Sequence, residues 1–311
     1  MNFGKIAILG NGISAGLLAY LLSPKNKITV LKGKNHMFSP IPEILPRDTF
    51  FNALGMNHHE QNKVIENTKS HLTDFILNRN NAENKISICS NDKYYIYDKE
   101  KLADYLISNS NVEDIQFQNI EDVKSLENYD LIFDCRGKRS IMDDPSYHTR
   151  IIFPARTKCS YIIAECPEAS IESTMTFWTD SNKYLKYKKT FFTIPLKNHK
   201  MSIGCSYNPN HFIHHQDLLE MASGHGIKIF EDQIFTSGEA LPNILKSSTN
   251  LKNVIPIGES SESSCPLTEY GVLKSLNQIY KVLGNQFSPI SIKRHFNNSE
   301  IDPHIPMELC A

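Results

Sequence analysis

The residues with the clearest chemical potential form a glycine-rich turn near the N-terminus. The segment KIAILG, residues 5–10, is apolar and β-branched, and NGISAG follows it directly, which indicates a strand, a tight turn and a helix. Gly10, Gly12 and Ala15 match the pattern G-x-G-x-x-G/A. The first glycine permits the turn, the second lets the backbone approach a pyrophosphate, and the small third residue allows close packing. Since the helix N-terminus would then hold the pyrophosphate, the turn predicts a dinucleotide-binding site.

A lysine stands where such a site usually places an acid. The second apolar run, KITVL, ends in Lys32. In the usual arrangement a carboxylate at this point accepts hydrogen bonds from the adenosine ribose, and an ammonium group has no acceptor. Two interpretations follow. Either the ribose is held weakly, or the lysine favours a 2′-phosphate, which is the NADP interpretation.

The elements that position these residues belong to a chain of moderate size and balanced charge. Its 311 residues can bury a large core and form one large domain or two interleaved ones. Lysine and arginine number 33 against 34 acids, which gives no reason to expect nucleic acid or an anionic membrane as partner. We therefore expect a small-molecule substrate. No apolar stretch is long enough to span a bilayer, and the seven scattered cysteines suit a reducing compartment, so we predict a cytoplasmic protein.

Helical and strand patterns alternate along the chain. We expect a helix over residues 62–78, a strand followed by a helix over 93–109, short strands over 150–210 and a helix over 214–226. Two later segments end an apolar strand in a glycine, as the first one does. DLIFDCRGKRS runs into Asp134 and Gly137, and NVIPIGES ends at Gly258 and Glu259 before a loop and an amphipathic helix. Three glycine-bearing strand ends in one chain favour a single dinucleotide site built from separate segments.

Together these segments resemble the flavin-dependent monooxygenases, especially the branch of tryptophan halogenases and styrene-monooxygenase-like enzymes. AILGNGISAG is similar to their FAD fingerprint, DLIFDCRGKRS to the strand that backs the cofactor, and IPIGESSESSCPLTEYG to the segment beside the flavin ring. The resemblance implies a mixed α/β protein of the glutathione-reductase type. Its FAD-binding fold would be Rossmann-like, with an inserted and mostly antiparallel substrate sheet.

The resemblance also divides the chain. We expect a discontinuous FAD-binding domain of residues 1–35, 95–150 and 245–290, a substrate-binding region of residues 36–94 and 151–244, and a C-terminal tail of residues 291–311. The candidate cofactor-binding residues are Gly10, Gly12, Ser14, Ala15, Lys32, Lys99, Asp134, Gly137, Gly258, Glu259, Pro266 and Gly271.

Candidate catalytic residues follow from the same resemblance, with departures. Lys69 lies close to the position of the halogenases' catalytic lysine. Their essential carboxylate is replaced by Thr268, with Glu269 one step away. Lys99 replaces an arginine that approaches FAD, so it keeps the charge and loses the planar fork. The TFFTIP segment lacks the two tryptophans of their W-x-W-x-I-P motif. These departures make halogenation the minor interpretation.

Aromatic residues and histidines complete the candidates. Trp178, Phe191 and Phe192 would supply an apolar wall for a substrate. We expect no metal site, because no carboxylate or cysteine lies at ligand spacing from His58, His59, His211, His214 and His215.

The predicted function is that of an FAD-dependent monooxygenase. It would hydroxylate or epoxidise a small aromatic or apolar metabolite through a flavin hydroperoxide, using reduced flavin from a partner reductase. Two alternatives stay open: a halogenase-like enzyme with a rearranged site, and a binding or non-redox protein that keeps the flavoprotein fold around a degenerate cofactor site.

Overall fold

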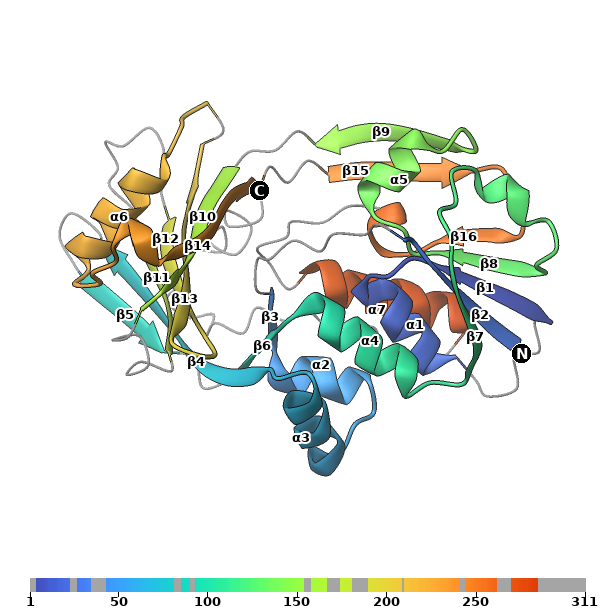
Figure 1. Cartoon of the computed structure of the whole chain (residues 1–311), viewed down its shortest axis with the longest axis horizontal. Helices are drawn as coiled ribbons and strands as arrows, with labels where there is room; N and C mark the ends of the chain where they lie inside the picture. Colours follow the sequence, from blue (N-terminus) through green and yellow to red (C-terminus); the bar gives the residue numbers. More distant parts are fainter. Residues whose placement is uncertain are drawn as a thin grey trace.

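The computed structural model describes residues 4–22, 27–34, 43–80, 85–89, 93–153, 158–166, 174–180, 190–208, 210–240, 244–261 and 270–284. Its elements form a five-stranded sheet and a nine-stranded sheet, with helices packed around both (Figure 1). None of the helices in these ranges has both the length and the apolar character needed to cross a membrane.

The first part is a five-stranded parallel sheet. Its order is β16-β8-β1-β2-β7, with β1 at Lys5–Leu9, β2 at Lys27–Lys32, β7 at Val112–Phe117, β8 at Leu131–Asp134 and β16 at Val254–Pro256. Both faces of β1 are buried: Ile6 and Ile8 belong to one core cluster, and Ala7 and Leu9 to another. In a parallel sheet the carboxyl ends lie at one edge, where ligands of such folds bind. The glycine turns after β1, β8 and β16 therefore meet at this edge.

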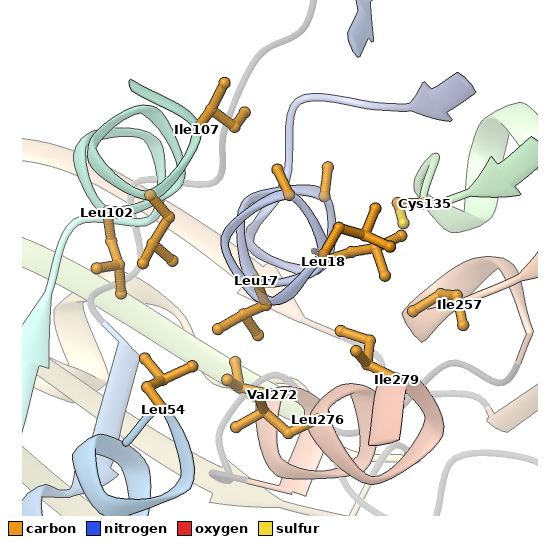
Figure 2. Close-up of a cluster of buried hydrophobic side chains, with 14 of the residues drawn as sticks. Leu17, Leu18, Leu54, Leu102, Ile107, Cys135, Ile257, Val272, Leu276 and Ile279 are labelled. Carbon is orange, nitrogen blue, oxygen red and sulfur yellow. The ribbon is translucent and has the colours of Figure 1, made fainter. Parts of the chain in front are cut away.

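Three helices cover one face of this sheet. They are α1 (Ile13–Leu21), α4 (Lys99–Ser108) and α7 (Tyr270–Leu283). Leu17 and Leu18 of α1 face Leu276 and Ile279 of α7 (Figure 2). A Cβ added to Gly16 would lie 3.0 Å from the Ala103 backbone of α4, so this glycine allows the close approach of the two helices. We expected the small Ala15 to allow close packing of the helix on the strand, which is a different contact.

The second part is a nine-stranded, mostly antiparallel sheet, as predicted. Its order is β14-β10-β13-β12-β11-β4-β6-β3, with β5 beside β4. The bounds are β3 Glu43–Pro46, β4 His71–Asn80, β5 Lys85–Cys89, β6 Tyr94–Tyr97, β10 Lys158–Glu165, β11 Thr174–Asp180, β12 Thr190–Leu196, β13 Lys200–Tyr207 and β14 Ile234–Ala240. Strand β4 pairs with β6 through residues 71–73 and runs parallel to β11 through residues 74–80.

The remaining elements lie around the two sheets. They are α2 (Arg47–Ala53), α3 (His58–Asn67), α5 (Lys138–Asp143), α6 (His215–Gly224), the paired strands β9 (Tyr147–Phe153) and β15 (Ile244–Thr249), and the 3-10 helices Val123–Leu126, Glu231–Gln233 and Gly258–Ser260. Helix α6 covers the face of the second sheet that points away from the first part (Figure 1).

The helix expected over residues 62–78 was wrong beyond residue 67. Helix α3 begins at a capping box between Asn57 and Glu60 and ends at Asn67. Lys69 has a positive φ of 53°, and the Ser70 N–H donates to the Ile65 carbonyl, which closes the helix C-terminus. Strand β4 begins two residues after Lys69. Because this stop is made by a lysine and not by a glycine, the sequence carries no ordinary signal for it.

The packing of residues 43–67 differs from the expected division. Leu45, Phe50, Phe51 and Val64 belong to the same core cluster as Leu17 of α1. This segment thus packs with the helices of the five-stranded part, although we had assigned residues 36–94 to the substrate-binding region.

Candidate functional site

The first two glycine turns touch each other. Gly10 follows β1 with a φ of +121°, and its N–H donates to the Leu31 carbonyl at 3.0 Å. A Cβ at this position would lie 2.6 Å from the Cys135 carbonyl oxygen in the turn after β8. Any side chain here would strain the backbone and push the turns apart, so both the conformation and the contact require glycine.

The glycine turn after β16 contacts the first helical turn of α1. Gly258 has a φ of +70°, and a Cβ there would lie 2.3 Å from the Ser14 Oγ and 3.0 Å from the Ser275 Oγ. The Ser14 hydroxyl donates to Ser275 of α7 at 3.0 Å, and the Ser275 hydroxyl donates to the Gly271 carbonyl at 2.9 Å. The Ser14–Ser275 hydrogen bond therefore joins α1 to α7, whereas the Ser275–Gly271 bond lies within α7.

Gly12 is the member of the fingerprint that faces open space. It caps α1 in an extended conformation, and a Cβ added to it would meet no atom of the described residues within 4 Å. The first N–H groups of a helix have no intrahelical partner and carry the positive end of the helix dipole. The α1 N-terminus thus offers an accessible backbone surface to an anion.

A group of charged side chains lies beside these turns. Lys99, at the first position of α4, makes a 2.6 Å ion pair with Glu43, which also accepts a hydrogen bond from the Tyr97 hydroxyl at 2.6 Å. The Glu259 carboxylate accepts from the Lys138 backbone N–H, and the Cβ position of Gly137 lies 4.0 Å from it. Lys99 and Glu43 both influence Glu259 electrostatically, so these residues form one group.

Glu259 combines solvent exposure with a perturbed carboxyl group. Its side chain is exposed, yet desolvation by the surrounding protein raises its pKa, the repulsion from Glu43 adds to this effect, and Lys99 opposes it. An exposed carboxylate with many protein atoms around it is the arrangement expected of a ligand-contacting group.

Asp134 has a different environment from the one we expected of a cofactor ligand. Its side chain is completely buried, and it accepts from Arg136 Nη2 at 2.6 Å and from the Tyr147 hydroxyl at 2.9 Å. Arg136 also contacts Asp144 at 2.7 Å. Burial acts to lower the pKa of Arg136, but the hydrogen bonds and charge of Asp134 outweigh it and raise this pKa. Since the Asp134 carbonyl accepts the Ile257 N–H at 2.8 Å, this network positions the β8 and β16 turns.

The Lys32 side chain forms an ion pair with a residue of α4. Its Nζ lies 2.6 Å from Asp104 Oδ1, and its side chain is only 12% exposed, against 52% for Asp104. The next residue, Gly33, exchanges two hydrogen bonds with the Asn11 side chain: its N–H donates to Oδ1 at 2.7 Å, and its carbonyl accepts from Nδ2 at 3.1 Å. The strand end is thereby tied to the fingerprint turn.

The three aromatic residues proposed as one substrate wall lie on two faces of the sheet. Trp178 pairs with Phe191, and both rings contact His225, with centroid distances of 4.3 Å and 5.1 Å, in the cluster covered by α6. Phe192 points the other way and packs against Phe177 at 5.4 Å. Neighbouring residues of a strand alternate between faces, so Phe191 and Phe192 contact different surroundings.

The candidate catalytic residues are less closely connected to this site. Lys69 is exposed in the turn between α3 and β4. Thr268, Glu269 and Pro266 lie outside the described residues, and their assigned roles stay predictions. Within the described ranges no group of three metal-ligating side chains occurs.

The sequence interpretation missed several polar residues of the site: Asn11, Glu43, Tyr97, Asp104, Arg136 and Ser275. Arg136 could have been found, since it lies within DLIFDCRGKRS beside the predicted Asp134. Asn11 likewise lies within AILGNGISAG, between Gly10 and Gly12. The others stand outside the motifs quoted above, and only the fold brings them to the glycine turns.

Comparison with known proteins identifies the fold. No protein-family model matches the sequence, and no curated protein matches it significantly. Among solved structures, aklavinone-11 hydroxylase in complex with FAD and aklavinone matches with a TM-score of 0.60 at 12% identity over 89% of this chain. A flavin-dependent halogenase from Xanthomonas campestris gives 0.60 at 13% over 98%, and a tryptophan 6-halogenase from Streptomyces toxytricini gives 0.63 at 13% over 92%.

These matches confirm the predicted fold. The chain has the mixed α/β fold of flavin-dependent hydroxylases and halogenases, in which a mostly antiparallel sheet is inserted into a Rossmann-like part. It spans 62% of the length of the hydroxylase and 72% and 73% of the lengths of the two halogenases.

Proposed function

We propose that this chain, which shares the fold of FAD-dependent hydroxylases and halogenases, binds FAD and is a flavin-dependent oxygenase acting on a small aromatic or apolar molecule. The observation that carries the proposal is the convergence of three glycine turns around an accessible helix N-terminus. Gly10 and Gly258 each permit a contact that no side chain would allow, and Gly12 leaves the α1 N-terminus open. A plain dinucleotide fold needs only the first of these turns.

The residues around these turns fit the parts of FAD. The N–H groups at the start of α1 suit the pyrophosphate. Glu259 is an exposed acceptor suited to the hydroxyl groups of the ribityl chain, and Lys99 is a cation that the pyrophosphate could share with Glu43. Asp134 and Arg136 hold the turns in place from within the protein.

Reduced FAD, when bound, would supply the activation of oxygen. The face of the second sheet that carries Phe192 and Phe177 would exclude water from the reacting substrate. Trp178 and Phe191 would support that sheet from its other side, beneath α6. We further propose a partner reductase as the source of reduced flavin and the cytoplasm as the site of action.

A single substitution tests the cofactor assignment. In Gly12→Ala the new methyl group meets no protein atom, so it should leave the apo protein folded while it obstructs a pyrophosphate. The weaker helix capping by alanine destabilises the protein, whereas the lower conformational entropy of the unfolded chain stabilises it, and each effect is below about 1 kcal/mol. Gly224→Ala is the control, because its added Cβ also meets no atom but it ends the distant helix α6.

The readouts are FAD titration by flavin fluorescence and denaturant unfolding without FAD. We expect the wild type and Gly224→Ala to bind FAD and Gly12→Ala to bind it much more weakly at equal stability. Equal FAD affinity in all three proteins would contradict the placement of the pyrophosphate. A wild type that binds no FAD would contradict the proposed function and favour a protein with a degenerate cofactor site.

Halogenation is tested separately. Incubation with reduced FAD, bromide and a panel of indoles should give no brominated product, because Thr268 cannot take up a proton near neutral pH as the missing carboxylate could. A brominated product that is lost in Lys69→Ala would establish the halogenase alternative.

A further inference from the structure

The end of β2 lacks an acidic residue, but a carboxylate from another element lies beside it and can replace it. Lys32 occupies the position where the fold usually provides a ribose acceptor, and its Nζ holds Asp104 Oδ1 at 2.6 Å. The lysine therefore brings a carboxylate to the strand end from a different element, α4. Residues 32 and 104 are separated by 72 positions, so only the packing of α4 on α1 makes the pair.

The packing places Asp104 beside the fingerprint helix. Its neighbour Ala103 is the residue whose backbone would lie 3.0 Å from a Cβ on Gly16, one helical turn beyond the cap residue Gly12. Helix α4 thus packs against α1 at Ala103, and the carboxylate of the next residue, Asp104, reaches Lys32 at the end of β2. The adenosine half of a dinucleotide bound at the α1 N-terminus runs toward this strand end.

Exposure distinguishes the two members of the pair. The Lys32 side chain is 12% exposed and that of Asp104 is 52% exposed. The carboxylate is therefore the more accessible group. Within the described part of the chain, its second oxygen, Oδ2, has no hydrogen-bond partner and can accept from a hydroxyl group, while its charge offsets the attraction of Lys32 for a phosphate.

We propose that Asp104 is the ribose-binding carboxylate of this chain, held in place by Lys32, and that the pair selects an adenosine ribose without a 2′-phosphate. The proposal rests on the proposed FAD-binding function and names the residue that distinguishes FAD from NADP-like ligands. On this proposal Lys32→Glu would set two carboxylates side by side and weaken binding.

The test uses two fragments of the adenosine half-site, ADP and adenosine 2′,5′-bisphosphate, together with FAD and FMN. Calorimetric titrations compare the wild type with Asp104→Asn, Lys32→Met and Glu113→Gln. Glu113 is the matched control, because it is an exposed carboxylate on the neighbouring strand β7 and its loss changes the net charge equally.

We expect the wild type to prefer ADP to the bisphosphate. Asp104→Asn should bind ADP and FAD about ten- to a hundredfold more weakly, the loss expected for a hydrogen bond to a charged group, and should shift toward the bisphosphate because Lys32 is freed. FMN, which has no adenosine, should bind the wild type and Asp104→Asn equally. Lys32→Met should retain part of the ADP affinity, and Glu113→Gln should match the wild type.

Two results would overturn the inference: unchanged ADP and FAD affinity in Asp104→Asn, or a wild type that already prefers the bisphosphate. Failure of the proposed function has another signature, since no flavin would then bind to any variant. Far-ultraviolet circular dichroism and thermal unfolding of each variant ensure that a loss of affinity is not a loss of folding.

Discussion

Replacement of Gly258 by alanine should separate two physical demands on the turn after β16. The residue has a φ of +70°, where an L side chain is strained, and its added Cβ would lie 2.3 Å from the Ser14 Oγ. Gly55 has nearly the same φ, +69°, but a Cβ there would meet nothing within 4 Å. Gly55→Ala therefore reports the backbone strain alone, and Gly258→Ala reports the strain together with the steric conflict.

The expected magnitudes follow from these contacts. The left-handed conformation costs a residue with a Cβ about 1–2 kcal/mol, which is the full effect expected for Gly55→Ala. In Gly258→Ala the Ser14 side chain must also rotate away and lose its 3.0 Å hydrogen bond to Ser275. That loss adds about 1 kcal/mol, so the free energy of unfolding should fall by about 2–3 kcal/mol in total.

Denaturant unfolding of the apo proteins measures both values, and a double-mutant cycle assigns the difference. In Ser14→Ala/Gly258→Ala the hydroxyl that causes the conflict is absent, so the double variant should be more stable than the sum of the single effects predicts. If Gly258→Ala costs no more than Gly55→Ala, or if the cycle shows no coupling, the described contact between the third turn and α1 is incorrect.

Two further predictions concern charged groups. Arg136→Met should destabilise the protein by about 3–5 kcal/mol in denaturant unfolding, because the buried carboxylates of Asp134 and Asp144 lose their partner. A loss of less than about 1 kcal/mol, which is the effect expected of an exposed ion pair, would contradict the network. For Glu259, desolvation by the surrounding protein raises the pKa, so the folded state binds the proton more tightly than the unfolded state does. The protein therefore loses stability as the pH rises from the ordinary value of 4.5 through the raised pKa. Glu259→Gln should flatten this part of the stability profile, and an unaltered profile would exclude the burial effect.

Local patterns accounted for the parts of the fold that the sequence predicted. Apolar strands that end in glycine specified β1, β8 and β16, and the positive φ of Gly10 and Gly258 is a property of each residue's own backbone. The end of α3 was not predictable in this way, because Lys69 adopts a left-handed conformation that glycine usually provides. The three aromatic side chains lie on two faces of the sheet for a simpler reason, because strand alternation separates Phe191 from Phe192.

The ion pairs could not be read from the sequence. Lys32 with Asp104 and Lys99 with Glu43 each join segments that only the packing of α4 and the β3–β6 pairing bring together. In the sequence these four residues are separate charges with no indicated partner. The structure turns them into neutralised pairs, which changes what each lysine can contribute to binding an anion.

The course of strand β4 has a mechanical consequence for the molecule. Residues 71–73 are hydrogen-bonded to β6 and residues 74–80 to β11, so β4 joins two regions of the nine-stranded sheet, the one with β6 and β3 and the one with β11 to β14. A rigid rotation of one region against the other would have to break these hydrogen bonds, and torsion of the strand is the cheaper deformation. Strand β6 leads through Asp98 directly into α4. Torsion that originates at the inserted sheet would therefore be transmitted to α4 and displace Lys99 and Asp104 together.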